Sequence, residues 1–196
     1  NASSGTARNL YVTLAAGGPT STTATNNSVT ESSLAQVYAY NSSGVTPTAY
    51  GLPSTASAAQ EQVVFNWVMN AWGDPLHSEP QLVNYGYTGG NYAAAAADPT
   101  LQENVVFVSD NDGILHAVDA NAGHELYAFS PIEELNKATV RQTTESNGTP
   151  LLDSLSHHRT TYGLDSTWTF WRKANPSDPS QVSFVYGYGG QRRGGN

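Results

Sequence analysis

The sequence contains no cysteine, and this absence excludes several classes of site. A disulfide scaffold, a thiolate zinc site, an iron–sulfur cluster and a cysteine-attached haem all require thiols. The chain also lacks an apolar run of the ~18 residues that a membrane helix needs, so we expect no membrane span. It begins at Asn1 without Met and without a signal-peptide pattern, and we therefore expect a processed or trimmed chain.

Charged side chains are also scarce. They make up 12% of the 196 residues, whereas typical globular domains contain about 25%. No Lys or Arg lies between Arg8 and Lys137, and the net charge of the chain is −8. The acidic part is therefore expected to repel nucleic acid and anionic lipid. The segment from Lys137 onward has a small excess of bases. This basic end can pair with the acidic part of the same molecule or of a neighbour, or both can be solvated faces without a partner.

What the sequence does contain is one clear helix signal, at residues 58–72. Ser57 followed by Gln60 predicts a capping box at the start of the helix. Apolar residues then fall on one face at helical spacing: Val64, Trp67, Val68, Ala71 and Trp72. We expect both tryptophans to anchor the core. Gly73 is placed to end the helix in a left-handed conformation.

The remaining pattern indicates short strands, with residues 91–102 as a loop around an alanine run that includes a short helical turn. The expected strands are 8–15, 34–40, 80–87, 103–109, 114–118, 124–129, 166–173 and 182–188. The strand at 103–109 is an apolar run, which is typical of burial on both faces. Asp112 and Gly113 predict a hairpin turn after it. Ser130 is expected to cap a short helix, with Pro131 in the first turn and Glu133 at the third position.

Three short antiparallel strands between residues 103 and 129 cannot bury both of their faces alone, so they need neighbouring sheets stacked on them, as in a β-propeller blade. The expected fold is mainly β: a partial β-propeller with one amphipathic helix near 58–72. We expect a Thr/Ser/Asn-rich β and loop region at 1–56. A helix followed by a propeller-blade segment with an incomplete ring is expected at 57–196.

The stretch AVDANAGHELY (117–127) resembles the tryptophan-docking motif of quinoprotein-type propellers, A-x-D-x-x-T-G-x-x-x-W. Ala117, Asp119, Gly123 and Tyr127 stand at the matching positions, with Tyr127 in place of the usual Trp and Ala122 in place of the usual Thr. The resemblance implies that Asp119 and Gly123 shape the turn between two strands. It also implies that Tyr127 packs onto a neighbouring blade.

Longer blocks resemble the C-terminal propeller domain of the PilY/PilC family, whose members are type IV pilus tip-associated adhesins and pilus-biogenesis factors. These blocks are GDPLHSEPQLVNY (73–85), VVFVSDNDGILHAVDANAGHELYAFSP (105–131) and YGGQRRGGN (from Tyr188). The resemblance runs from about Arg8 to the end, is densest over 73–131, and stops where the family continues, so we expect a fragment of a longer protein. It implies a non-enzymatic, extracellular, pilus-associated module. Its expected partners are pilus subunits, a host or surface receptor, other parts of the same propeller, or copies of itself.

The residues support a catalytic or metal site less well than they support a propeller module. Quinone catalysis needs a complete propeller, and we expect no catalytic, cofactor or metal residues. Because His116 alternates with Ile114 and Val118 along one strand, we expect it to be a hydrogen-bonded structural histidine. The oxygens of residues 110–112 are suited to calcium, but a turn explains the same residues without a metal. The family's calcium loop, D-x-D-x-D-x-x-x-D, does not occur in the sequence.

Two alternative functions stay open from the sequence. The first is a structural subunit or fragment of an extracellular filament, assembled through open strand edges. The second is an intracellular or periplasmic propeller scaffold for outer-membrane assembly. A quinoprotein-type enzyme comes after both of these.

Overall fold

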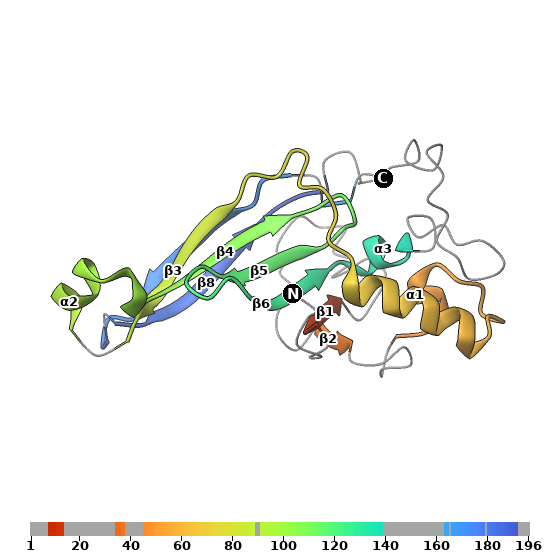
Figure 1. Cartoon of the computed structure of the whole chain (residues 1–196), viewed down its shortest axis with the longest axis horizontal. Helices are drawn as coiled ribbons and strands as arrows, with labels where there is room; N and C mark the ends of the chain where they lie inside the picture. The colour runs from red at the N-terminus through yellow and green to blue at the C-terminus, as the bar shows by residue number, and fades with distance from the viewer. Residues whose placement is uncertain are drawn as a thin grey trace, which may run out of the picture.

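A computed structural model describes residues 8–13, 34–37, 45–88, 91–138, 163–164, 166–178 and 180–191. Parts of the expected strands at 8–15 and 34–40, and the terminal RRGGN, lie outside these ranges. Within them, eight strands form a six-stranded sheet and a two-stranded hairpin, and three short α-helices lie at the ends of the larger sheet (Figure 1).

The larger sheet has the strand order β2-β1-β6-β5-β4-β3. Its strands are β1 (Leu10–Thr13), β2 (Leu34–Val37), β3 (Gln81–Tyr87), β4 (Gln102–Ser109), β5 (Leu115–Asp119) and β6 (Glu125–Ser130). Strands β3 to β6 are a continuous antiparallel meander, whereas β1 joins β6 in parallel and pairs β2 antiparallel. The expected strands are therefore present. The sheet also joins strands from both expected regions, 1–56 and 57–196, and a division between these regions stays a prediction.

Glycines in the left-handed region make the two tight turns of the meander. Gly113, between β4 and β5, has φ 84°, and Gly123, between β5 and β6, has φ 71°. Side chains with a Cβ rarely adopt such angles. The hairpin predicted at Asp112–Gly113 is thus confirmed, and Val105 to Ser109 pair in register with Asp119 to Leu115.

Helix α1 (Ala58–Asn70) begins as predicted and ends differently. The Ser57 side chain accepts from the Gln60 backbone N–H, and the Gln60 side chain accepts from that of Ser57. However, the C-cap is Ala71 in an extended conformation, so the left-handed Gly73 cap is wrong. The chain instead turns toward the β4–β5 turn, where the Gly73 backbone N–H donates to Asp110 at 2.7 Å. Gly73 is still constrained, because a Cβ there would meet the Asn111 side chain.

The short helices show a second difference from the prediction. Helix α2 (Tyr92–Ala97) takes up the alanine run, and a 3-10 turn, η4 (Pro99–Leu101), follows it. Helix α3 (Ile132–Leu135) has Pro131 at its N-cap and no side-chain cap. The predicted Ser130 cap is wrong because the Ser130 hydroxyl donates to the Gly113 carbonyl at 2.8 Å, which ties β6 to the β4–β5 turn.

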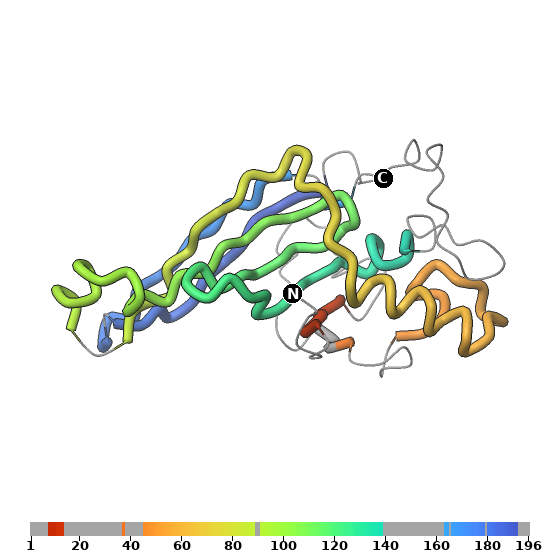
Figure 2. Tube along the Cα trace, viewed as in Figure 1, coloured from red at the N-terminus to blue at the C-terminus, as the bar shows by residue number. Residues whose placement is uncertain are grey.

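Two hydrophobic clusters cover different parts of the sheet. The first lies where α1, α3 and the 3-10 turn η3 (Pro47–Tyr50) pack on β1, β2 and β6, and it includes Leu10, Val12, Val64, Val68 and Leu135. The second lies on the opposite face, between β3–β6 and the hairpin of β7 (Thr169–Ala174) and β8 (Val182–Tyr188), which runs along the larger sheet in Figure 2. Trp67 packs at the edge of the first cluster, whereas Trp72 is 52% exposed, so its predicted core position is wrong.

The described chain is mainly β, with few helices, as predicted. Neither a closed ring nor a barrel is present among the residues described. The partial β-propeller therefore stays a prediction. What the structure adds is a two-layer arrangement in which the hairpin covers one face of the meander.

Candidate functional site: the stacked sheets and their outer faces

The four residues of the docking-motif resemblance lie together around the β5–β6 turn. Asp119 accepts hydrogen bonds from the backbone N–H groups of Asn121 (2.7 Å) and Ala122 (2.9 Å), and these bonds hold the pKa of its carboxyl below the usual value. The Gly123 N–H donates to the Asp119 carbonyl at 2.8 Å. Asp119 and Gly123 therefore lie in the turn between two strands, as the resemblance implies.

Ala117 and Tyr127 are cross-strand partners on the face that the hairpin covers. The Tyr127 ring makes edge contacts with Phe107 (6.3 Å between centroids) and Tyr11 (6.2 Å). Burial raises the pKa of the Tyr127 hydroxyl, which is hydrogen-bonded to Tyr85. Tyr127 thus contributes to the interior between the two layers. Docking onto a neighbouring blade stays a prediction.

The hairpin is held against β3 and β4 by aromatic stacking and by its own backbone. Phe170 of β7 stacks on Phe107 of β4 with ring centroids 4.3 Å apart. At one end, the Tyr87 N–H donates to the Ser180 carbonyl at 2.9 Å, and a Cβ on Gly86 would collide with that carbonyl. Because Gly86, with φ 136°, has no side chain, the backbone of β3 can approach the backbone of the hairpin at this point.

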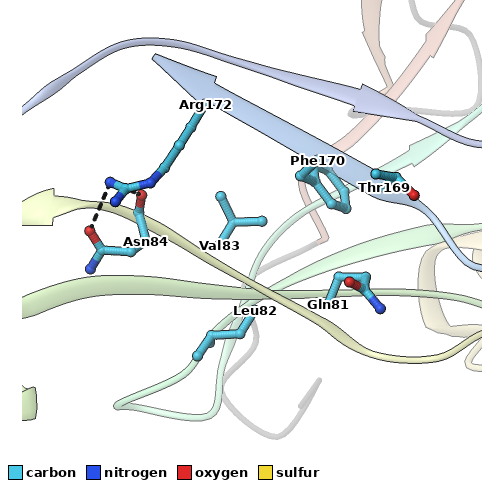
Figure 3. A pocket seen from close by; sticks show the side chains of 7 residues that line it. All are labelled: Gln81, Leu82, Val83, Asn84, Thr169, Phe170 and Arg172. Carbon is cyan, nitrogen blue, oxygen red and sulfur yellow. Dashed lines mark hydrogen bonds between the residues drawn. The ribbon is translucent and has the colours of Figure 1, made fainter. Parts of the chain in front are cut away.

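A shallow cleft separates the free edge of β3 from β7. It is lined by Gln81, Leu82, Val83 and Asn84 of β3 and by Thr169, Phe170 and Arg172 of β7. The Arg172 guanidinium donates to the Asn84 carbonyl (3.2 Å) and side-chain oxygen (3.3 Å), and Figure 3 shows it reaching across the cleft. A charged side chain on an edge strand blocks pairing with another chain. Arg172 therefore covers the Asn84 backbone at this edge, and assembly through open strand edges stays a prediction.

The outer face of the hairpin carries a continuous group of rings. We call it the aromatic face: Trp171 and Lys173 of β7 with Phe184, Tyr186 and Tyr188 of β8. Trp171 is cross-strand to Tyr186 and stacks on it (6.0 Å, 15°), and Phe184 and Tyr188 continue the row at 4.7 Å and 6.5 Å from Tyr186. Trp171, Tyr186 and Tyr188 are each about half exposed.

The opposite outer surface, on the larger sheet, carries a row of aliphatic side chains. Leu82, Val106 and Val118 are successive cross-strand partners on β3, β4 and β5, and we call them the aliphatic row. Leu82 is 65% exposed, and the two valines are partly exposed. The prediction that the strand at 103–109 is buried on both faces is therefore wrong. Helices α1 and α3 pack at the β1–β2–β6 end, whereas the row lies toward β3 (Figure 1).

Beside the aliphatic row, β5 carries a buried group of charges centred on His116. The His116 Nδ1 lies 2.7 Å from Glu125 Oε2, and its Nε2 lies 2.9 Å from Asp110 Oδ2. Arg8 forms an ion pair with Glu125 at 2.7 Å and donates to the Val68 carbonyl in the last turn of α1. The predicted hydrogen-bonded structural histidine is confirmed. Asp110 is shared between this group and the turn, since it also accepts from the N–H groups of Gly73 and Ile114.

Both nitrogens of His116 face carboxylates, which favours the charged imidazolium with two N–H donors. Burial by itself lowers the pKa of His116, but the bonds to Asp110 and Glu125 outweigh burial and raise it. Burial likewise opposes the charge on Glu125, yet His116 and Arg8 lower the pKa of that carboxyl. The group is therefore a neutralised buried ion network that fastens the loop after α1 to the sheet.

The chemical candidates considered from the sequence find no new support. Within the described ranges, no group of three or more His, Asp or Glu side chains is arranged to hold a metal. Asp110, Asn111 and Asp112 form the β4–β5 turn, and two of them bind the backbone of the loop after α1. In the same part of the chain, no helix has both the length and the apolar composition that crossing a bilayer requires.

Sequence reasoning missed the residues that distinguish the two outer surfaces. Trp171, Phe184, Tyr186 and Tyr188 were not assigned to one outward face from the sequence. A usable signal existed only in residues 184–188, where aromatics occupy alternate positions. Arg8 was missed because its partner Glu125 is 117 positions away in the chain.

Comparison with known proteins gives one partial match. Over 69 residues the chain is 42% identical to a "Type IV pilus biogenesis factor PilY1 homolog" from Xylella fastidiosa (strain Temecula1 / ATCC 700964). The match covers 30% of this chain and 6% of the relative, so the chain spans a small part of that protein's length. No protein-family model matches the chain, and no solved structure matches it. A region of the chain is thus related to PilY1.

Proposed function

We propose that this chain is a non-enzymatic module of a pilus-associated protein of the PilY type, acting at the cell surface through contacts made by its sheets. The observation that carries the proposal is the 42% identity over 69 residues to a pilus-biogenesis factor. The two-layer stack supports a contact role, because each layer leaves an apolar outer surface. Exposed apolar patches of this kind mark interaction sites.

The finer parts of the proposal are an adhesive role, an extracellular location and a partial β-propeller. Tyrosine-rich surfaces suit adhesion because an aromatic ring offers a large contact area with few rotatable bonds. The four-stranded antiparallel meander with a second sheet stacked on it supports a blade-like arrangement. Pilus subunits and a host or surface receptor are the proposed partners.

The test is a deletion of the gene in its source organism, followed by complementation. We expect fewer pili by electron microscopy, or weaker attachment to a surface, with recovery when the intact gene is restored. Normal piliation and normal attachment in the deletion strain would contradict the proposal.

A second candidate function is a subunit of an extracellular filament. The specific observation that favours it is that the aromatic face and the aliphatic row lie on opposite outer surfaces of one molecule. Surfaces placed in this way can join copies in a chain. Electron microscopy of the purified protein separates the two candidates, since ordered fibres favour the filament and discrete particles exclude it.

A further inference from the structure

We propose that the aromatic face of one copy of this chain binds the aliphatic row of a second copy, head to tail. The proposal rests on the proposed function through surface contacts. The two surfaces and the partner are specified, and copies assemble through the faces of their sheets instead of through open strand edges.

The aromatic face has the features of a sheet surface that packs against another layer. Its partners across the hairpin, Thr169–Tyr188, Trp171–Tyr186 and Lys173–Phe184, all lie on the side away from Phe170 and Val185, which pack inward. Trp171 is 54% exposed and Tyr188 is 59% exposed. Aromatic side chains of this size supply most of the binding energy at protein interfaces.

The aliphatic row offers a flat acceptor of matching character. Figure 3 shows Val83, which belongs to the cluster under the hairpin, directed toward β7, and the Leu82 side chain directed to the other side of β3. Val106 and Val118 continue on that side across β4 and β5. Trp72, which is 52% exposed and stacks on His116 of β5, extends the apolar surface at one border. Aromatic and branched aliphatic side chains pack well between facing sheets.

Charge complementarity points to a copy of this chain as the partner. In the part of the chain that the structure describes, the exposed Lys and Arg side chains are Arg172 and Lys173, both on β7. Lys173 lies over the Phe184 ring at 5.8 Å, within the aromatic face itself. The loop after α1, whose Trp72 covers His116 beside the row, carries the exposed Asp74 and contains no Lys or Arg. The hairpin of one copy thus presents a cation, and the border of the acceptor side presents the carboxylate of Asp74.

The two surfaces are different and lie on opposite sides of the stack, so the contact is heterologous. Such contacts produce rings when the rotation closes and open filaments when it does not. Each copy has one donor face and one acceptor face. Disabling one face on each of two variants should therefore leave one working contact in their mixture.

The test uses the full chain and the variants Trp171→Asp, which disables the donor, and Leu82→Asp, which disables the acceptor. Ala59→Asp adds the same charge at an exposed position in the first turn of α1 and is the matched control. Masses are measured by light scattering after size exclusion over a range of concentrations. Circular dichroism checks that each variant is folded, and Tyr186→Asp replaces Trp171→Asp if that variant is unfolded.

We expect the wild type and Ala59→Asp to form species heavier than the 20.8 kDa monomer, and each face variant alone to stay at that mass. An equimolar mixture of the two face variants should form a species of twice that mass and stop there. Lys173→Glu should raise the dissociation constant about tenfold or more, because it places like charges together. Raised salt should weaken the wild-type contact.

Three results would overturn the inference: a wild type that is monomeric throughout, a face variant that still associates alone, or a mixture that forms no pair. The second result indicates a symmetric contact through one face. A monomeric wild type would indicate that both faces bind sheets of another polypeptide instead of a second copy. None of the three results affects the proposed pilus role, which the deletion strain tests independently.

Discussion

The Trp72 indole stacks on the imidazole of His116, with ring centroids 3.9 Å apart and an angle of 24° between the planes. Trp72 is half exposed and His116 is fully buried, so the indole covers the ion network of Arg8, Glu125, His116 and Asp110 from outside. A cation under an aromatic face is stabilised by the ring quadrupole. This contact explains why an apolar residue at the end of the helical stripe lies outside the core.

The ion network predicts a dependence of stability on pH. The pKa of His116 is raised in the folded protein, so its contribution is complete below about pH 6.5, the pKa of an unfolded histidine, and is lost as the pH rises through the folded value. The pKa of Glu125 is lowered, so its contribution is present above about pH 4.3 and is lost as the pH falls through the folded value. Stability should therefore be highest in the weakly acidic range.

Urea unfolding of the wild type and of His116→Gln over a pH series measures this effect. We expect the variant to lose about 3 kcal/mol of unfolding free energy in the weakly acidic range, because it leaves two buried carboxylates with one base. The unfolding free energy of the variant should also no longer fall as the pH rises above the weakly acidic range. It should still fall as the pH is lowered into acid. Parallel curves for the two proteins would show that His116 carries no charge in the fold.

The close approach of the two layers predicts a large effect at Gly86. In Gly86→Ala the new Cβ meets the Ser180 carbonyl, and the φ of 136° is unfavourable for any side chain. We expect a loss of about 2–4 kcal/mol of unfolding free energy, from backbone strain plus displacement of the hairpin. Gly123→Ala is the control, because its φ is also positive but no atom lies within 4 Å of the new Cβ.

For Gly123→Ala the expected loss is about 1–2 kcal/mol, the cost of a left-handed residue alone. Thermal and urea unfolding give both values. Equal losses at the two positions would mean that the contact at Ser180 has no importance for stability.

Neighbouring aromatics on β7 should separate stability from association. Phe170→Ala removes the ring stacked on Phe107 between the layers, and we expect it to cost about 3 kcal/mol of unfolding free energy. Trp171→Ala removes an exposed ring from the aromatic face and should change stability by less than about 1 kcal/mol. The paired measurement is urea unfolding with light scattering at one protein concentration.

In that comparison Trp171→Ala is expected to lose association and to keep its unfolding free energy. Phe170→Ala is expected to lose unfolding free energy, while the molecules that remain folded still associate. If Trp171→Ala proves as unstable as Phe170→Ala, the outer face is part of the folding core and is unavailable for a partner.

Several elements were predictable because local chemistry determines them. Ser57 and Gln60 specify the start of α1, and Asp112–Gly113 and Asp119–Gly123 specify the turns of the meander. The end of α1 was not predictable from the residues near it. Gly73 suits a left-handed cap, but the contact with Asp110 at 2.7 Å draws the chain away in an extended conformation. A tertiary hydrogen bond here overrides the local preference.

The candidate surfaces were predictable only in part. Strands β7 and β8 were expected from their composition, but aromatics occur at both alternations, with Phe170 next to Trp171. The sequence therefore could not indicate which ring faces inward. Partners far apart in the chain, such as Arg8 and Glu125, depend on the parallel pairing of β1 with β6, for which the local pattern carries no signal.

The central claim is that this chain works through the outer faces of its sheets, and the most direct measurement is made in the source organism. The gene is altered to encode Trp171→Asp or, as a matched control, Ala59→Asp, and piliation and surface attachment are counted in each strain. We predict that Trp171→Asp lowers piliation or attachment to the level of the deletion strain while Ala59→Asp behaves as the wild type. Full piliation and attachment with a folded, normally abundant Trp171→Asp protein would contradict the claim.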